Sequence, residues 1–233
     1  GAAMVASYAK KKLGDKIDCE LFKYPHDLAK YIENKNPKFV CFTNYSWTFD
    51  ISYQFAKKIK DKNPGTIIVF GGPNYPNEEA TQKEFLLAYP AIDFNIKGEG
   101  ETAFLDLFEK LEQFNFDINA LKKSRTKTGN CHYIYNDEFI EGETLPRIDD
   151  LDKIPSPYLS GSLDKFFDTY LTPSIQTIRG CPFKCTFCQE GKDYFTKIHK
   201  FSKERIKQEL EYIAKRVKVT HLQIADSNFG MYK

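Results

Sequence analysis

The sequence predicts an α/β protein with a doubly wound parallel sheet in its N-terminal half and a second strand–helix–strand unit near its C-terminus. Two observations lead to this fold class. Short apolar strand patterns alternate with amphipathic helical patterns through the first 112 residues or so, which is typical of βαβ units. A proline-punctuated stretch then separates this region from a second run of the same kind. The chain of 233 residues, 41% hydrophobic and 28% charged, is long enough for two modest cores.

The N-terminal half, residues 1–112, is expected to be one domain of Rossmann-like type. Helices are expected over residues 2–13, 26–34, 49–62, 77–88 and from 101 to about 112, and strands over 17–24, 38–43, 66–70 and 93–97. Ligands of such folds lie at the carboxyl ends of the strands. Because this chain opens on a helix and not on a strand, we expect a first strand and its loop to be missing before residue 1.

The second half is expected to contain a connector and the beginning of another domain. Residues 113–130 are polar and are expected to be irregular, and residues 131–141 to form a hairpin around Asn136-Asp137. We expect residues 113–170 to link the domains, with an extended proline-rich part at 145–163. Residues 171–233 then offer a strand at 174–179, a helix at 202–216 with Ser202 as N-cap, and a strand at 219–225.

Composition argues against several function classes. The formal net charge is only +2, with basic and acidic residues interleaved, so nothing supports a nucleic-acid or anionic-membrane partner. No apolar run approaches the ~20 residues needed to span a bilayer, and no signal peptide opens the chain. A cytoplasmic location is therefore expected. Three of the six cysteines crowd into eight residues, which is typical of metal or catalytic sites and not of disulfides.

The clustered cysteines are Cys181, Cys185 and Cys188, spaced C-x3-C-x2-C between an expected strand and an expected helix. Thiolates are soft ligands suited to iron–sulfur clusters and zinc. Three thiolates hold three corners of a [4Fe–4S] cubane and leave one iron open to a substrate, since no fourth cysteine follows. A structural zinc site is the alternative, with His199 as its fourth ligand. Three unrelated thiols are the remaining alternative.

The stretch RGCPFKCTFC, residues 179–188, resembles the signature of radical S-adenosylmethionine (SAM) enzymes, with the usual aromatic residue, Phe187, before the last cysteine. This resemblance implies that residues 171–233 begin a (β/α) barrel of the TIM-barrel type and that the open iron binds SAM. It implies reductive cleavage to a 5′-deoxyadenosyl radical, and an electron donor such as flavodoxin or ferredoxin. It also places Asp226 and Asn228 beside SAM, although both residues are equally expected in a capped turn.

The resemblance extends to the N-terminal half, which looks like the cobalamin (B12)-binding-type domain that precedes many radical SAM barrels. Gly71-Gly72-Pro73 ends one strand, and GEGE follows another; glycine there lets backbone approach a flat ligand. The expected contacts to a corrinoid are Ser46, Trp47, Thr48, Gly71, Gly72, Gly98, Glu99, Gly100 and Glu101. Each also has a structural explanation: a simple turn, a helix N-cap, core packing for Trp47, or acidic groups favoured by a helix dipole.

One departure from the family is plain. The motif D-x-H-x-x-G, whose histidine ligates cobalt from below, is absent, and none of His26, His132, His199 or His221 stands in such a motif. Cobalamin stays an expectation without an axial histidine. The resemblance implies methylation or rearrangement of an unactivated carbon on a small-molecule or peptide substrate. The alternatives are a radical enzyme whose Rossmann-like domain does not bind cobalamin, and a fragment that only holds a cluster or cobalamin.

Overall fold

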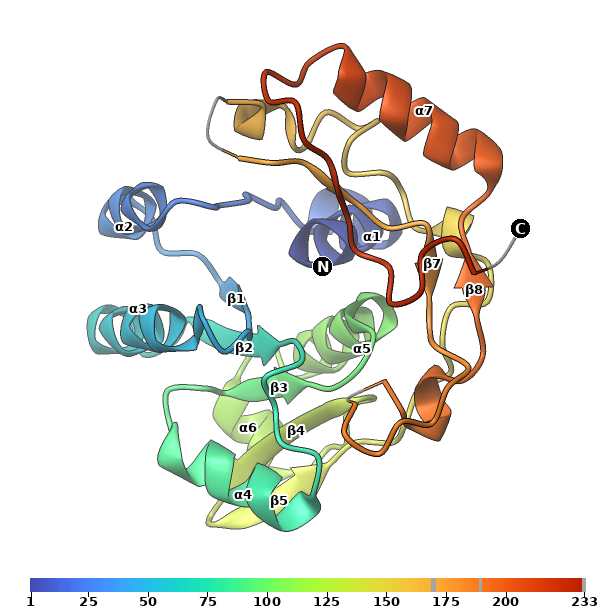
Figure 1. Ribbon diagram of the computed structural model, residues 1–233. Coiled ribbons are helices and arrows are strands. Elements are labelled where there is room, and N and C mark those ends of the chain that lie inside the picture. The colour runs from blue at the N-terminus through green and yellow to red at the C-terminus, as the bar shows by residue number, and fades with distance from the viewer. Residues whose placement is uncertain (169–170, 189, 232–233) are drawn as a thin grey trace. The chain divides into compact units, whose positions relative to one another are not determined.

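The structure is a computed structural model that describes residues 1–168, 171–188 and 190–231 (Figure 1). The chain folds as two compact units, residues 1–146 and residues 147–233. No described helix is long and apolar enough to cross a membrane. The boundaries expected at residues 112 and 170 stay predictions, and residue 170 itself lies outside the described residues.

The N-terminal unit is built on a five-stranded mixed sheet whose strand order follows the sequence. The first three strands are parallel, as predicted, and the last two are antiparallel. The strands are β1 (Phe39–Thr43), β2 (Ile67–Gly71), β3 (Phe94–Ile96), β4 (Cys131–Tyr135) and β5 (Glu138–Glu141). Parallel pairing brings the carboxyl ends of β1, β2 and β3 to one edge of the sheet.

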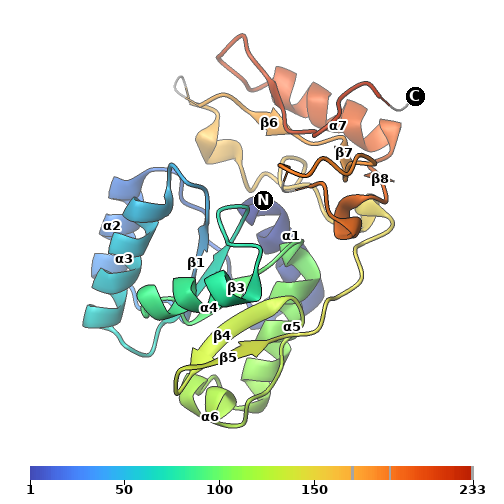
Figure 2. The ribbon, with the colours of Figure 1, turned by 60° about the horizontal axis from the view of Figure 1, so that its bottom comes forward.

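Helices cover both faces of this sheet, which confirms the α/β prediction (Figures 1 and 2). On one face α1 and α5 pack over Ile67, Val69 and Phe94, and on the other face α3 and α4 pack over Ile68 and Phe70. The alternation follows from the two-residue period of a strand buried on both sides. The helices are α1 (Ala2–Leu13), η1 (Gly14–Lys16), α2 (Pro25–Asn34), α3 (Phe49–Lys62), α4 (Glu79–Ala88), α5 (Gly100–Gln113) and α6 (Ile118–Lys123).

Two expectations for this unit are wrong. Residues 17–24 largely alternate between half-buried and exposed, as the residues of a strand would, but they pair with no strand. The alternating pattern predicts which side chains are buried, whereas a strand also needs hydrogen bonds to a partner strand. The stretch 113–130 is not irregular throughout, because α6 forms within it. Asp117 caps α6 by accepting hydrogen bonds from the backbone N–H groups of Asn119 (2.9 Å) and Ala120 (3.0 Å).

The hairpin is confirmed, and it belongs to the sheet. β4 and β5 meet at Asn136 and Asp137, whose φ values of 49° and 60° are those of a type I′ turn. β4 pairs with β3 through Asn95 and Ile96, so the hairpin extends the sheet by two strands (Figure 2). The start of β4 and the end of β5 therefore lie at the same edge as the carboxyl end of β3.

The C-terminal unit contains a parallel strand pair joined through a helix. β6 (Ser174–Ile175) pairs with β9 (Gln223–Ile224), and α7 (Lys203–Ala214) connects them along the chain. The strand expected at 174–179 is broken, because β7 (Ile178–Arg179) leaves β6 and pairs antiparallel with β8 (His199–Lys200). Ser202 caps α7 as predicted, accepting from the Arg205 N–H at 3.1 Å. Short 3-10 helices complete the unit: η2 (Leu151–Lys153), η3 (Asp164–Phe166) and η4 (Asp193–Phe195).

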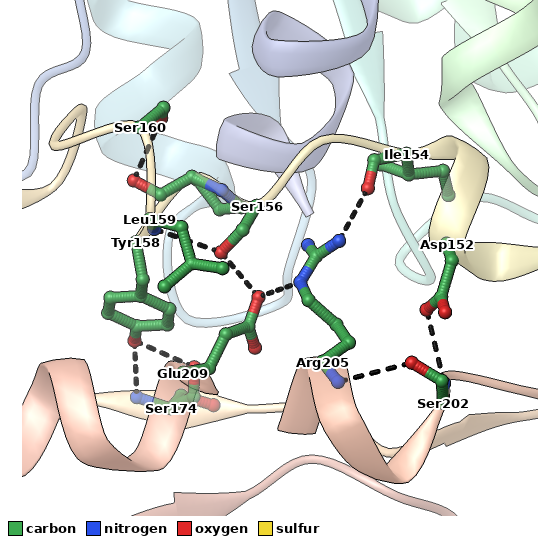
Figure 3. A network of polar contacts seen from close by, with 11 residues as sticks. Asp152, Ile154, Ser156, Tyr158, Leu159, Ser160, Ser174, Ser202, Arg205 and Glu209 are labelled. Atoms are coloured by element: carbon green, nitrogen blue, oxygen red, sulfur yellow. Dashed lines mark hydrogen bonds and ion pairs between the residues drawn. The ribbon is translucent and has the colours of Figure 1, made fainter. Parts of the chain in front are cut away.

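The proline-rich connector is fixed to α7 and is not a free linker (Figure 3). Ser156 donates a hydrogen bond to the Glu209 carboxylate at 2.5 Å, and Arg205 contacts the same carboxylate oxygen at 2.7 Å. Arg205 also donates to the carbonyl of Ile154 at 3.0 Å. Because Glu209 and Arg205 are nearly buried, with side chains 6% and 10% exposed, this network holds residues 154–156 against the helix.

Candidate functional site

The first candidate site is the edge of the N-terminal sheet where β1, β2 and β3 end. Asn44, directly after β1, and Asn74, in the loop after β2, form a reciprocal amide pair. The Asn44 side chain donates to the Asn74 carbonyl at 3.0 Å, and the Asn74 side chain donates to Asn44 Oδ1 at 3.1 Å. The backbone N–H of Asn74 also donates to the Asn44 carbonyl at 3.0 Å. These contacts clamp the Gly-Gly-Pro loop onto the end of β1.

Gly72 makes this clamp sterically possible. Its φ is +142°, and a Cβ built there would lie 2.6 Å from the Asn44 carbonyl oxygen and 2.9 Å from the Asn44 nitrogen. Glycine at residue 72 is therefore explained by close approach of two loops of this chain. Gly71, the last residue of β2, pairs with Thr43 and Ile96 in the sheet.

The loop after β1 carries an exposed aromatic stack. Trp47 is 78% exposed, and its ring lies parallel to Tyr45 with centroids 4.9 Å apart. Trp47 is therefore a surface residue and not a core residue. It stacks on Tyr45 with one face of its ring, and the other face is open to solvent. Ser46 is exposed beside it. The Thr48 hydroxyl accepts from the Tyr45 N–H at 3.3 Å and donates to the Thr43 carbonyl at 3.2 Å, so it closes the loop.

The GEGE loop follows β3 at the same edge. Gly98 is exposed with a φ of +77°, Glu99 is the N-cap residue of α5, and Gly100 begins the helix next to Val5 of α1. Glu101 is buried in the first turn of α5, where the helix dipole favours a carboxylate. Of this loop, Gly98 is the residue most open to a ligand.

The second candidate site is the cysteine loop. The thiols of Cys181, Cys185 and Cys188 are free; Cys181 is half-buried and the other two are exposed. Gly180, with a φ of +104°, turns the chain out of β7, and the Cys181 N–H donates to the Phe195 carbonyl at 2.8 Å. A Cβ at residue 180 would lie 2.5 Å from the Lys197 carbonyl oxygen, so the two ends of the loop are tightly apposed.

Two consecutive turns shape the second half of the loop. The Cys188 N–H donates to the Cys185 carbonyl at 3.1 Å, and the Gly191 N–H donates to the Cys188 carbonyl at 3.0 Å. Nevertheless, the described residues contain no group of three His, Cys, Asp or Glu side chains arranged to hold a metal ion. His199 lies buried in β8, with Nδ1 2.9 Å from the Asp149 carbonyl. His199, the fourth ligand considered for zinc, therefore has one ring nitrogen engaged with the backbone.

The segment after β9 contacts the end of the cysteine loop. Ser227 donates a short hydrogen bond to the Glu190 carboxylate, two residues beyond Cys188. Asp226 accepts from the backbone N–H groups of Thr177 (2.7 Å) and Ile178 (3.2 Å), and so fixes the break between β6 and β7. The Asn228 amide nitrogen is buried and has no partner among the described residues. Phe187 is 91% exposed.

Sequence reasoning missed three residues of these two sites, Asn44, Asn74 and Glu190, and it missed the contact of Ser227 with Glu190. Asn44 stands directly after a predicted strand, and Ser227 lies between two residues that were singled out, so position at a strand end was the available signal. Nothing in the sequence pairs Asn44 with Asn74 or Ser227 with Glu190, because each contact joins residues about thirty or more positions apart.

The geometry agrees with comparisons to known proteins. Residues 1–108 match the family model described as the B12 binding domain. The chain is 30% identical over 203 residues to 2-(S-pantetheinyl)-carbapenam-3-carboxylate methyltransferase of Streptantibioticus cattleyicolor. It is 31% identical over 201 residues to the cobalamin-dependent radical SAM methyltransferase TokK of Streptomyces tokunonensis. Each alignment covers 84% of this chain and 28% of the relative.

A solved structure shares the fold. The cobalamin-dependent SAM radical enzyme OxsB, with aqua-cobalamin and SAM bound, superposes with a TM-score of 0.68 at 20% identity. The match covers 98% of this chain and 31% of OxsB, so the chain spans less than a third of the length of these three proteins.

The parallel strands and the helices around them agree with the match of residues 1–108 to the B12-binding domain. Over 84% of its length the chain is similar to a cobalamin-dependent radical SAM methyltransferase, which confirms the resemblance drawn from its cysteine and glycine motifs.

Proposed function

We propose that this chain is part of a cobalamin-dependent radical SAM methyltransferase, in which the N-terminal unit binds a corrinoid and the cysteine loop holds a [4Fe–4S] cluster. One observation carries the proposal: the same chain contains a match to the B12-binding domain and a loop with three free thiols. Ser227 joins this loop to the segment after the parallel strand β9. Bound together, such groups supply a transferable methyl group and reductive cleavage of SAM to a 5′-deoxyadenosyl radical.

The edge of the N-terminal sheet fits a large flat ligand. Trp47 and Ser46 follow β1 and Gly98 follows β3, and all three are exposed. β2, which ends at Gly71, pairs with both of these strands. Backbone without side chains allows close approach, while Ser46 offers a hydrogen bond to a polar ligand tail. The histidines of this unit offer no axial ligand: His132 is buried within the sheet, and His26 lies in α2.

The cysteine loop fits an iron–sulfur cluster by its donor set. Cys181, Cys185 and Cys188 are free thiols; Cys181 is half-buried and the other two are exposed to solvent. The three thiolates would each bind one iron. Asp226 and Asn228 stand at the end of β9, where the unpartnered Asn228 amide would donate to SAM and the Asp226 carboxylate orders the strand break beside it. Phe187 would shield the cluster from water.

The substrate class, the electron donor and the cellular location are inferred from the chemistry of the proposed reaction. A small-molecule or peptide substrate with an unactivated carbon fits a methylation of this type, and a flavodoxin or ferredoxin fits as electron donor. We assign the protein to the cytoplasm, because the cluster requires reducing conditions. Residues 171–233 would then begin a TIM-type barrel, with β6, α7 and β9 as its first βαβ unit.

Anaerobic reconstitution with iron and sulfide tests the cluster. The wild-type chain should bind about four iron atoms per chain, and Cys185→Ala should lose the characteristic absorbance. Cys19→Ala, which alters a half-buried thiol in the N-terminal unit, is the matched control and should keep it. A chain that takes up zinc and no iron, or a Cys185→Ala variant with full iron content, would contradict the proposal.

A further inference from the structure

The loop after β2 is anchored on a second side, away from Asn44. Tyr75, three residues beyond Gly72, turns its side chain into the unit and is 5% exposed. Its ring packs edge-on against Phe85 of α4 with centroids 5.4 Å apart. Its hydroxyl oxygen lies 3.1 Å from Nδ1 of His132, the second residue of β4. The Gly-Gly-Pro loop is thus held between β1 and the hairpin.

His132 connects this anchor to the end of β5. It is 1% exposed, and Nε2 lies 3.4 Å from Oε1 of Glu141, its partner across the hairpin. The pKa of His132 is lowered to about 4, chiefly by burial and also by nearby Lys97. Burial also raises the pKa of Tyr75. At neutral pH the ring is therefore neutral, so the Tyr75 hydroxyl donates to Nδ1 and Nε2–H points to Glu141.

The same cluster reaches the loop after β3. Lys97, the residue before the GEGE loop, lies 4.0 Å from the Glu141 carboxylate. Its backbone N–H donates to the Asn130 carbonyl at 2.8 Å, immediately before β4. The hairpin therefore contacts both of the loops that were assigned to the corrinoid, one through Tyr75 and one through Lys97.

We propose that Tyr75 and His132 are positioning residues for corrinoid binding: their hydrogen bond, braced by Glu141, fixes the Gly71–Asn74 turn at the sheet edge in the conformation that receives the ligand. This inference rests on the proposed binding of cobalamin. By this inference the hairpin, which extends the sheet beyond its parallel strands, stabilises the loop at the binding edge. Pre-organised loops bind more tightly because less ordering remains to be done on binding.

Titration of the intact chain with hydroxocobalamin tests this inference. Tyr75→Phe keeps the ring and removes the hydroxyl, and should weaken the affinity about five- to tenfold. Tyr133→Phe is the matched control, since Tyr133 is equally buried on β4 but donates to the Thr126 carbonyl, at 3.0 Å, on the other face. It should change the affinity less than about twofold.

A double variant separates positioning from stability. In Tyr75→Phe/His132→Leu neither polar partner is left unpaired, so the unfolding free energy should recover towards the wild-type value. The corrinoid affinity should stay low. Hydrogen exchange of the ligand-free chain gives an independent readout: the Asn74 amide should exchange faster in Tyr75→Phe than in Tyr133→Phe.

The two proposals fail in different ways. A wild-type chain that does not bind hydroxocobalamin overturns the proposed function of this unit, and the positioning role with it. A wild type that binds while Tyr75→Phe binds equally well, with unchanged exchange at Asn74, overturns the positioning role alone. Recovery of affinity in the double variant also overturns it, since stability would then explain the loss.

Discussion

At the scale of single residues, the binding edge of the N-terminal unit depends on loops that approach closely. Gly72 and Asn44 touch through their backbones, and the amides of Asn44 and Asn74 bond reciprocally. Residue type alone does not predict these contacts, because glycine follows many strands and asparagine occurs in many turns. Their roles arise from contact between two loops about thirty residues apart.

Replacement of Gly72 by alanine tests the close approach. The substitution places a Cβ against the Asn44 backbone and keeps a φ of +142° that alanine rarely adopts. We expect a loss of about 1–3 kcal/mol in unfolding free energy, measured by urea denaturation. Gly65→Ala is the control, because the nearest atom to its Cβ is 3.4 Å away in the Asn63 side chain. Equal midpoints for the two variants would contradict the account.

The buried His132 predicts how stability depends on pH. Its pKa is lowered from 6.5 to about 4 in the folded chain, chiefly by burial. Between these values the unfolded chain binds a proton that the folded chain does not, so stability falls as pH decreases from about 6.5 to about 4. The shift corresponds to a penalty of order 3 kcal/mol below pH 4.

His132→Gln isolates this contribution. The variant should show a smaller loss of unfolding free energy between pH 6.5 and pH 4 than the wild type, measured by denaturant titration at several pH values. His26→Gln, which removes an exposed histidine on α2, should keep the wild-type slope. A His132→Gln slope identical to the wild type would show that this ring titrates normally.

At the scale of elements, sequence periodicity predicted the parallel strands, their connecting helices, the hairpin and the N-cap of α7. The errors have physical causes. Residues 17–24 have the burial pattern of a strand, but a strand is defined by its partner. The break between β6 and β7 depends on Asp226 binding two backbone N–H groups from across the unit. Contacts of this kind, between residues distant in sequence, leave no local pattern.

The network of Figure 3 makes the attachment of the connector to α7 testable. Glu209→Gln removes one charge of a nearly buried pair and leaves Arg205 short of its counter-ion. We expect a loss of about 3–5 kcal/mol in unfolding free energy, measured by denaturant titration. Glu211→Gln, in the exposed pair with Lys207 on the same helix, should cost less than about 1 kcal/mol. Comparable losses would mean that the buried pair contributes no more than a surface pair.

At the scale of the whole molecule, the chain combines two compact units with separate candidate sites. The three cysteines were found from spacing alone, because a cluster motif is local in sequence. Glu190 and Ser227 could not be found in this way, since their contact depends on the fold of the unit. The relatives extend well beyond the region matched here, which covers 28% of each of the two methyltransferases.

The central claim is that the cysteine loop holds a [4Fe–4S] cluster with one iron open to SAM. Electron paramagnetic resonance of the reduced, reconstituted chain with and without SAM tests it most directly. The account predicts a cluster signal that requires Cys181, Cys185 and Cys188 and that changes when SAM is added. A cluster signal that SAM leaves unchanged, or no cluster signal in a chain that binds zinc, would contradict it.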